Sequence, residues 1–211
     1  MEPSVDWSQV AAIDQVIAKE RRAVTRLALG CSLPDWIASR LIADWGEAEA
    51  TSIARALNER APMTVRVNTL RGTRDEAVEL LKSEGIETHA GRFAREALIL
   101  DTRTNLFGTR AFKDGWVEAQ DEGSQLLAEL VDPYGTVVDL CAGAGGKTLA
   151  MAAMMKSRGR IVASDVDARK LEELKKRARR AGVSNTRAVA PEALDELRGR
   201  ADRVLVDAPC S

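Results

Sequence analysis

The sequence predicts an α/β protein in which a helical region and a small α+β region precede a partial sheet of parallel strands with helices on its faces. Short apolar strands alternate with helices after residue 134, and a glycine-rich turn joins the first of these strands to its helix. Upstream, apolar residues recur first with helical and then with strand spacing. Hydrophobic residues make up 45% of the 211 residues and charged residues 30%, as in ordinary globular proteins.

Residues 1–62 form the helical region. Apolar residues over 10–29 recur every three or four positions, which predicts a helix that Gly30 ends. A second helix is expected to open near Pro34 and to be interrupted at Gly46. The tryptophans of this region are expected to lie in its core.

Residues 63–118 form the small α+β region. Alternating residues over 63–70 predict a strand, and Thr73 with Glu76 has the spacing of a capping box that opens a helix. Short strands over 86–101 complete a β-α-β-β unit of the kind that often holds nucleic acid on a sheet face. The first strand lacks the aromatic pairs with which an RRM stacks bases, so the pattern alone argues only weakly for RNA.

The remaining residues, 119–211, predict a parallel sheet. The expected strands are GTVVDL, RIVASD, NTRAVA and RVLVDAP, and the expected helices are KTLAMAAMMKS and ARKLEELKKRARRAG. Such strands alternating with helices are typical of parallel sheets covered on both faces.

The turn between the first of these strands and its helix is the strongest local signal. Three glycines in four residues let the backbone turn tightly and approach a ligand, and the helix N-terminus offers free N–H groups. The candidate binding residues are Cys141, Ala142, Gly143, Ala144, Gly145, Gly146 and Lys147.

Two ligand classes compete for this loop. A Walker A loop, as in a P-loop NTPase, requires a glycine where the chain has Cys141. Against it, the next strand ends in Asp165, 20 residues beyond Gly145 (165 − 145), where nucleoside-binding sheets place a carboxylate on the ribose hydroxyls. A nucleoside is therefore favoured over a triphosphate. Asp167 stands where the following helix needs an N-cap, and capping is its expected role.

A carboxylate and a thiol follow the last strand, at Asp207 and Cys210. Ligands of open parallel sheets lie outside the carboxyl ends of the strands, so both groups are expected to face whatever the glycine loop binds. A thiol and a carboxylate beside a nucleoside pocket suit nucleophilic addition to a base.

Charge and composition exclude several classes of protein. The formal net charge of −1 provides no general attraction to RNA or to anionic membranes, so RNA must be bound by a local patch. The basic residues of 175–180 are expected to form a solvated helix face rather than an RNA contact. Three separated cysteines and one histidine predict neither a disulfide framework nor a metal site, and no membrane segment or secretion signal is apparent. We expect a cytoplasmic protein.

Several of these motifs together resemble the RsmB/Nop2/Sun family of RNA cytosine-5 methyltransferases. They are DLCAGAGGKT, SDVD and DAPCS, with RVNTL and GWVEAQDEGSQL upstream. The resemblance implies a Rossmann-like domain that binds S-adenosyl-L-methionine through residues 141–147 and Asp165. It also implies RNA, in particular ribosomal RNA, as the partner, with Asp207 on the target cytosine and Cys210 as a thiol that assists product release.

The attacking thiol of that family lies in a later Thr-Cys motif that the printed sequence does not contain. The resemblance therefore implies that residues 119–211 are the N-terminal half of the methyltransferase domain, truncated after DAPCS. We expect the 211-residue chain alone to turn over RNA slowly or not at all. A noncatalytic RNA-binding fragment is the alternative from another class.

Overall fold

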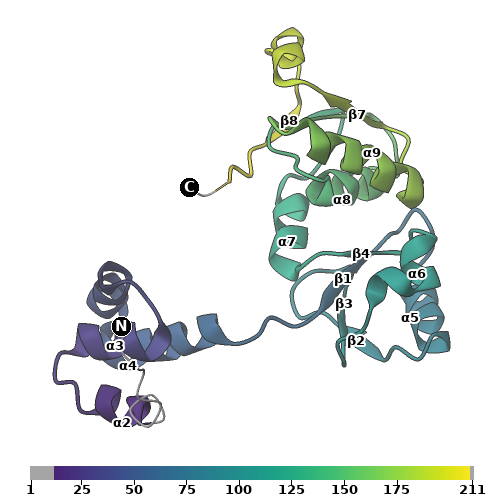
Figure 1. Cartoon of the computed structure of the whole chain (residues 1–211). Helices are drawn as coiled ribbons and strands as arrows, with labels where there is room; N and C mark the ends of the chain where they lie inside the picture. Colours follow the sequence, from purple (N-terminus) through teal and green to yellow (C-terminus); the bar gives the residue numbers. More distant parts are fainter. Residues whose placement is uncertain (1–11, 210–211) are drawn as a thin grey trace, which may run out of the picture. The chain divides into compact units, whose positions relative to one another are not determined.

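The computed structural model describes residues 12–209, which form two compact units (Figure 1). One unit ends at Ala61 and the other begins at Pro62. Each unit has its own buried clusters of hydrophobic side chains, so each is described by itself.

The first unit contains helices α2 (Ile13–Ala18), α3 (Ala23–Cys31) and α4 (Asp35–Asn58). The prediction of a single helix over 10–29 is wrong, because the chain leaves helical geometry between α2 and α3. Glu20 stabilises this break: its carboxylate accepts the backbone N–H of Arg22, and its carbonyl accepts a guanidinium N–H of Arg26. The expected stop at Gly30 is also wrong, since α3 ends one residue later at Cys31 and its C-cap is Ser32, which adopts a left-handed conformation.

Helix α4 is kinked at Gly46, where φ is +76°. The core between α3 and α4 contains Leu27 and Cys31 together with small side chains, namely Ala28, Ala38, Ala50 and Ala54. Trp36 and Trp45 are 73% and 62% exposed, so the expectation that these tryptophans lie in the core is wrong. Helices that pack through alanines approach each other closely, and the contact leaves no room for an indole ring.

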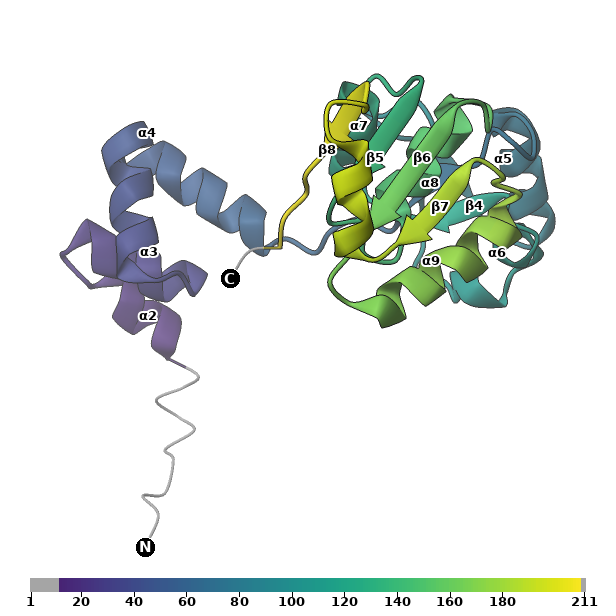
Figure 2. The same cartoon turned by 90° about the horizontal axis from the view of Figure 1, so that it is seen from above.

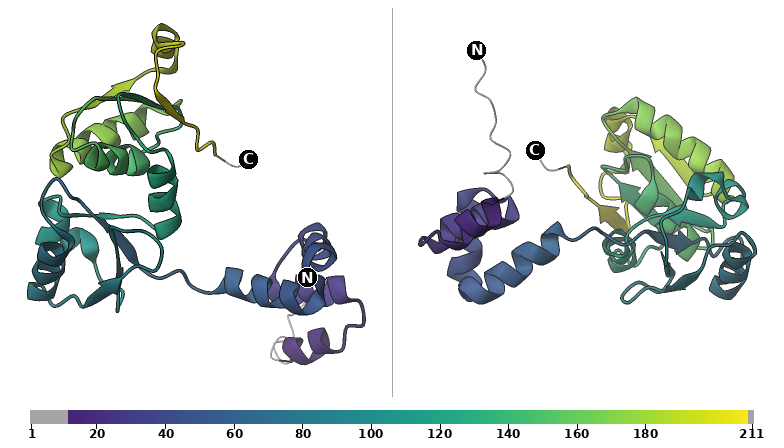
Figure 3. Two further views of the ribbon diagram at one scale, coloured as in Figure 1. Left: turned by 180° about the vertical axis from the view of Figure 1, so that it is seen from behind. Right: turned by 60° about the horizontal axis from the view of Figure 1, so that its bottom comes forward.

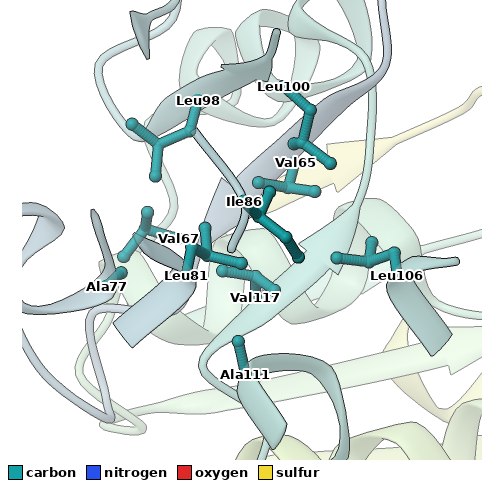
Figure 4. Close-up of a cluster of buried hydrophobic side chains, with 10 residues drawn as sticks. All are labelled: Val65, Val67, Ala77, Leu81, Ile86, Leu98, Leu100, Leu106, Ala111 and Val117. Atoms are coloured by element: carbon teal, nitrogen blue, oxygen red, sulfur yellow. The ribbon is translucent and has the colours of Figure 1, made fainter. Parts of the chain in front are cut away.

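The second unit begins with a four-stranded antiparallel sheet in the order β2-β3-β1-β4. Its elements are β1 (Thr64–Val67), α5 (Arg74–Ser83), β2 (Thr88–Ala90), β3 (Ala97–Leu100), η1 (Leu106–Gly108), α6 (Arg110–Lys113) and β4 (Val117–Ala119). The capping box at the start of α5 is confirmed: Thr73 Oγ1 accepts the Glu76 N–H, and the Glu76 carboxylate accepts the Thr73 N–H. Figure 4 shows how Val65, Leu81 and Leu98 meet in the core of this sheet.

The second sheet has the order β7-β6-β5-β8 and is parallel throughout, as the sequence predicts (Figure 2). Its elements are α7 (Glu122–Leu130), β5 (Thr136–Asp139), α8 (Gly146–Met154), β6 (Arg160–Ser164), α9 (Ala168–Ala181), β7 (Thr186–Val189), η2 (Pro191–Leu197) and β8 (Arg203–Leu205). Helix α8 is buried along most of its length because its side chains are small or apolar. The parallel sheet with its helices is the Rossmann-like α/β fold that the sequence predicts.

The two sheets of the second unit belong to one compact body (Figure 3), and hydrogen bonds join them. The Asn68 side-chain amide, just after β1, donates to the carbonyls of Gly115 and of Ala181 at the end of α9. Strand β4 was missed by the sequence reasoning, because three residues are too few to show alternation. The domain boundary expected after residue 118 falls within β4, and it stays a prediction.

Candidate functional site

A cavity of about 200 Å³ opens where β5 and β8 end, at the carboxyl edge of the parallel sheet. Its lining comes from the end of β4 and the segment after it, from α7, from the end of β5 and the glycine-rich loop with the start of α8, from α9 and from the segment after β8. The lining residues are Ala119, Gln120, Asp121, Ser124, Asp139, Cys141, Ala142, Gly146, Lys147, Arg177 and Asp207.

The glycine-rich loop joins β5 to α8 and turns at Gly145. Gly145 has φ of +88°, and a Cβ atom there would lie 2.6 Å from Cγ of Leu174 on α9. Glycine is therefore required both by the backbone conformation and by the close approach of α9. The tight turn places the free N–H groups at the start of α8 beside the cavity.

Asp165 follows β6, and its carboxylate lies against the same loop. Its two oxygens accept the backbone N–H of Gly143 at 2.8 Å and that of Asp167 at 2.9 Å. These bonds, the one from Asp167 first, hold the pKa of Asp165 below its ordinary value, so the group is ionised at neutral pH. The capping role expected of Asp167 is confirmed, because its side chain accepts the Arg169 N–H at the start of α9.

Lys147 and Asp207 form an ion pair across the cavity. The lysine side chain is only 18% exposed, whereas the aspartate is 44% exposed. The pairing requires β8 to run parallel beside β5, because only then do the start of α8 and the residues after β8 meet at one edge. An amine and a carboxylate at the open mouth of a cavity can bind polar edges of a ligand.

Some of the site residues that the sequence predicts line this cavity, and others lie beside it. Cys141, Ala142, Gly146, Lys147 and Asp207 line the cavity, whereas Gly143, Ala144, Gly145 and Asp165 form the loop and its support beside it. Cys210 lies outside the described residues.

Asp139, at the end of β5, is a site residue to which the sequence reasoning gave no role. It is almost fully buried, and one carboxylate oxygen accepts the hydroxyl of Thr148 at 2.7 Å. The other oxygen has no hydrogen-bond partner among the described residues. Burial raises the pKa of Asp139 to about 6, although the Thr148 hydrogen bond and the Lys147 charge oppose the shift. The signal in the sequence was its place as the first residue of the glycine motif.

Gln120 is a second residue that the sequence reasoning missed. It is 8% exposed and lines the cavity, and its side-chain carbonyl accepts Nε of Arg66 on β1 at 2.7 Å. The amide nitrogen therefore has a fixed direction, and it has no partner among the described residues. Burial lowers the pKa of Arg66 to about 10, which still leaves it charged at neutral pH. Both residues belong to motifs noted in the sequence, RVNTL and GWVEAQDEGSQL.

Arg177 on α9 ties the glycine-rich loop to the antiparallel sheet. One guanidinium nitrogen donates to the Ala144 carbonyl and another to the Glu118 carboxylate on β4, both at 2.9 Å. Arg180 pairs with the other oxygen of Glu118. The prediction of a solvated basic face is therefore wrong for Arg177 and Arg180, because the buried carboxylate of Glu118 draws both side chains inward.

Residues 12–209 offer no candidate for two further classes of site, a metal centre and a membrane span. They contain no group of three or more histidine, cysteine, aspartate or glutamate side chains that could hold a metal ion. Helix α4, although it has 24 residues, is too polar to cross a membrane, and no other helix of this part of the chain qualifies.

A parallel sheet with a glycine-rich loop after one strand and a carboxylate after the next defines a Rossmann-like, nucleoside-binding class of protein. Solved structures of methyltransferases share this fold. A methyltransferase homologue from Pyrococcus horikoshii superposes with a TM-score of 0.81 at 29% identity, over 91% of this chain and 64% of that one. NSun6 from the same organism, solved with SFG, superposes with a TM-score of 0.73 at 20% identity, over 82% of this chain and 69% of that one, and shows the shared fold.

Two family models match the chain, one across the boundary between the two units and one within the second unit. The RsmF/B-like ferredoxin-like domain of methyltransferases matches residues 33–106, and the 16S rRNA methyltransferase RsmB/F model matches residues 128–211. A probable ribosomal RNA small subunit methyltransferase B from Bacillus subtilis is 34% identical over 197 residues. That alignment covers 89% of this chain and 43% of the relative, so the chain spans less than half the relative's length. The chain belongs to the RsmB/F family of rRNA methyltransferases.

Proposed function

We propose that this chain takes part in the S-adenosylmethionine-dependent methylation of cytosine C5 in ribosomal RNA, in the cytoplasm. The observation that carries the proposal is the cavity at the carboxyl edge of the parallel sheet, where the glycine-rich loop, Asp139 and the Lys147–Asp207 pair meet. Membership of an rRNA methyltransferase family supports RNA as the substrate.

The cofactor is proposed to lie along the glycine-rich loop. Asp165 is ionised and 9% exposed, and it is fixed by two backbone N–H groups, so it is suited to accept hydrogen bonds from the ribose hydroxyls. Asp139 and the start of α8 are suited to the charged amino-acid end, since one offers an unpartnered carboxylate oxygen and the other free N–H groups. S-adenosylmethionine supplies the methyl group when bound.

The target cytosine is proposed to enter beside Asp207. Cytosine C5 is a poor nucleophile, and addition of a thiolate at C6 makes C5 enamine-like so that it can accept a methyl group. The Asp207 side chain, paired with Lys147, is suited to hold a proton against the ring nitrogen that takes up negative charge during this addition. Cys210, three residues beyond Asp207, is proposed to assist loss of the C5 proton and release of the product.

The cofactor proposal is tested by calorimetry with S-adenosylhomocysteine on the whole chain and on Asp165→Asn. The variant should bind about 10- to 100-fold more weakly, since a hydrogen bond to a charged group is worth about 1.5–3 kcal/mol. Asp167→Asn is the matched control, because asparagine still caps α9 and should bind like the wild type. Tight binding of ATP with magnesium, without binding of S-adenosylhomocysteine, would instead support a P-loop enzyme.

The cytosine proposal is tested with a chain that also carries the family's Thr-Cys motif, by transfer of a labelled methyl group to unmodified ribosomal RNA and separation of the nucleosides. The label should appear in 5-methylcytidine, and Asp207→Asn should reduce its rate of appearance by at least about 100-fold, as loss of a group involved in acid–base catalysis does. Label in another nucleoside would refute C5 methylation while leaving cofactor binding in place.

A further inference from the structure

A second cavity, of about 290 Å³, lies between α6 and α9. It is lined by two aromatic rings, two arginines, two glutamates and one alanine, which are Phe107, Phe112, Arg177, Arg180, Glu118, Glu173 and Ala119. Four of the seven lining residues, both phenylalanines among them, lie between the segments that the two family models match.

The aromatic side chains of this cavity have fixed positions. The Phe112 ring lies under the guanidinium of Arg180, whose central carbon is 3.9 Å from the ring centroid. The Phe107 ring meets Phe112 edge to face, with 4.9 Å between centroids and an interplanar angle of 89°. Phe107 is nevertheless 63% exposed. A fixed aromatic ring with this much accessible surface is a stacking platform for a planar ligand.

The charge around the cavity favours an anionic ligand. Glu118 is one carboxylate shared by the two cations Arg177 and Arg180, and the buried Nε of Arg180 has no partner among the described residues. The two helices beside the cavity carry more basic side chains than acidic ones; the acidic ones are Glu172 and Glu173 on α9, which pair with Lys175 and Lys176. The basic side chains are Arg110 and Lys113 on α6 and Arg169, Lys170, Lys175, Lys176 and Arg179 on α9.

The second cavity adjoins the first. Ala119 and Arg177 line both of them. A nucleic acid chain whose target base occupies the first cavity would therefore bring an adjacent nucleotide to the second. A base has a planar face and its phosphate is anionic, so one nucleotide matches both the exposed ring and the surrounding cations.

We propose that the cavity between α6 and α9 binds a nucleotide of single-stranded RNA, with its base stacked on Phe107 and its phosphate facing the basic side chains of α9. The site is a substrate subsite that extends the proposed function, on which the choice of RNA rests. Its stacking contact is sequence-tolerant, because every base has a π-face.

The experiment measures fluorescence anisotropy of a labelled single-stranded RNA of ~10 nucleotides, a length within the usual site size of such surfaces, on the whole chain without cofactor. Phe107→Ala should weaken binding about 5- to 100-fold, the range expected for loss of one stacked base. The slope of log affinity against log salt concentration should stay unchanged, because no charge is removed. Phe107→Trp should bind at least as tightly as the wild type.

Phe93→Ala is the matched control, since Phe93 is also 63% exposed, lies in the same unit and does not line the cavity. Equal RNA affinity of Phe107→Ala and Phe93→Ala would overturn the proposal, as would a wild type that binds no single-stranded RNA. Calorimetry with S-adenosylhomocysteine on Phe107→Ala should match the wild type, which separates failure of this subsite from failure of the proposed cofactor site. Tight binding of an acidic protein, with none of RNA, would identify a protein-docking surface instead.

Discussion

Asp139 shows how one residue of the site opposes the stability of the fold. Its carboxyl group is buried at the end of β5, and burial raises its pKa to about 6, from an ordinary value of about 3.9. Between these two values the folded chain holds a proton that the unfolded chain has lost. The free energy of unfolding contributed by this group therefore falls as the pH rises from about 4 to about 6, and it stays low above that.

Asp139→Asn should remove this pH dependence. Asparagine can still accept the Thr148 hydroxyl, but it carries no charge that burial penalises. The free energy of unfolding of the variant minus that of the wild type should therefore be about 2–3 kcal/mol larger at pH ~8 than at pH ~4. This follows from about 1.4 kcal/mol per unit of pKa shift. Urea unfolding of both proteins at the two pH values measures the gain. A stability difference that is the same at both would contradict the buried, protonated carboxyl.

Glu118 connects strand β4 of the antiparallel sheet with helix α9, which joins β6 to β7 of the parallel sheet. Its side chain is 2% exposed, and it pairs with Arg177 and Arg180, which are 17% and 21% exposed. Arg177 in turn donates to the carbonyl of Ala144 in the glycine-rich loop. The position of the loop thus depends on the antiparallel sheet as well as on its own helix.

Glu118→Gln should lower the free energy of unfolding by roughly 2–4 kcal/mol, because two largely buried guanidinium groups lose their counter-charge. Glu173→Gln on α9 is the matched control. Its side chain is 50% exposed and lies 3.6 Å from Lys176, so its loss should cost less than about 1 kcal/mol. Chemical unfolding of both variants gives the comparison, and equal effects would show that the buried pairs add nothing to stability.

At the scale of the whole molecule, the chain consists of two units with separate cores. Every buried hydrophobic cluster of residues 12–209 lies wholly before Ala61 or wholly after Pro62. The two sheets of the second unit, in contrast, are joined by Asn68 and Glu118. Cooperative folding is therefore expected to extend across both sheets but not across residue 62.

A chain of residues 62–211 should consequently fold alone. Its urea midpoint should agree with that of the same unit in the whole chain, because no buried hydrophobic cluster is lost. Separate expression, followed by chemical unfolding monitored through Trp116, measures this midpoint. Failure of the shorter chain to fold, or a fall in its midpoint by more than the error, would show that residues 1–61 contribute to its core.

The elements that depend on local chemistry could be predicted from the order of residues alone. The capping box at Thr73, the cap at Asp167 and the turn at Gly145 were all readable, because each follows from the conformational preference of one residue and its neighbours. The alternation of strands and helices predicted the parallel sheet, and that sheet placed Asp207 opposite the glycine-rich loop.

The contacts of the polar side chains, in contrast, follow from the folded arrangement of distant segments. In the sequence, the spacing of Arg177 and Arg180 is typical of a solvated helix face. In the structure both pair with Glu118 on β4, which lies 59 and 62 residues earlier in the chain. Gln120 and Arg66, 54 residues apart, become a fixed donor only when β1 and β4 lie side by side. The tryptophans of α4 are exposed for a similar reason, because the surface of α3 that meets α4 packs against alanines. Burial and pairing depend on which distant surfaces meet, and the order of residues along one chain does not record that.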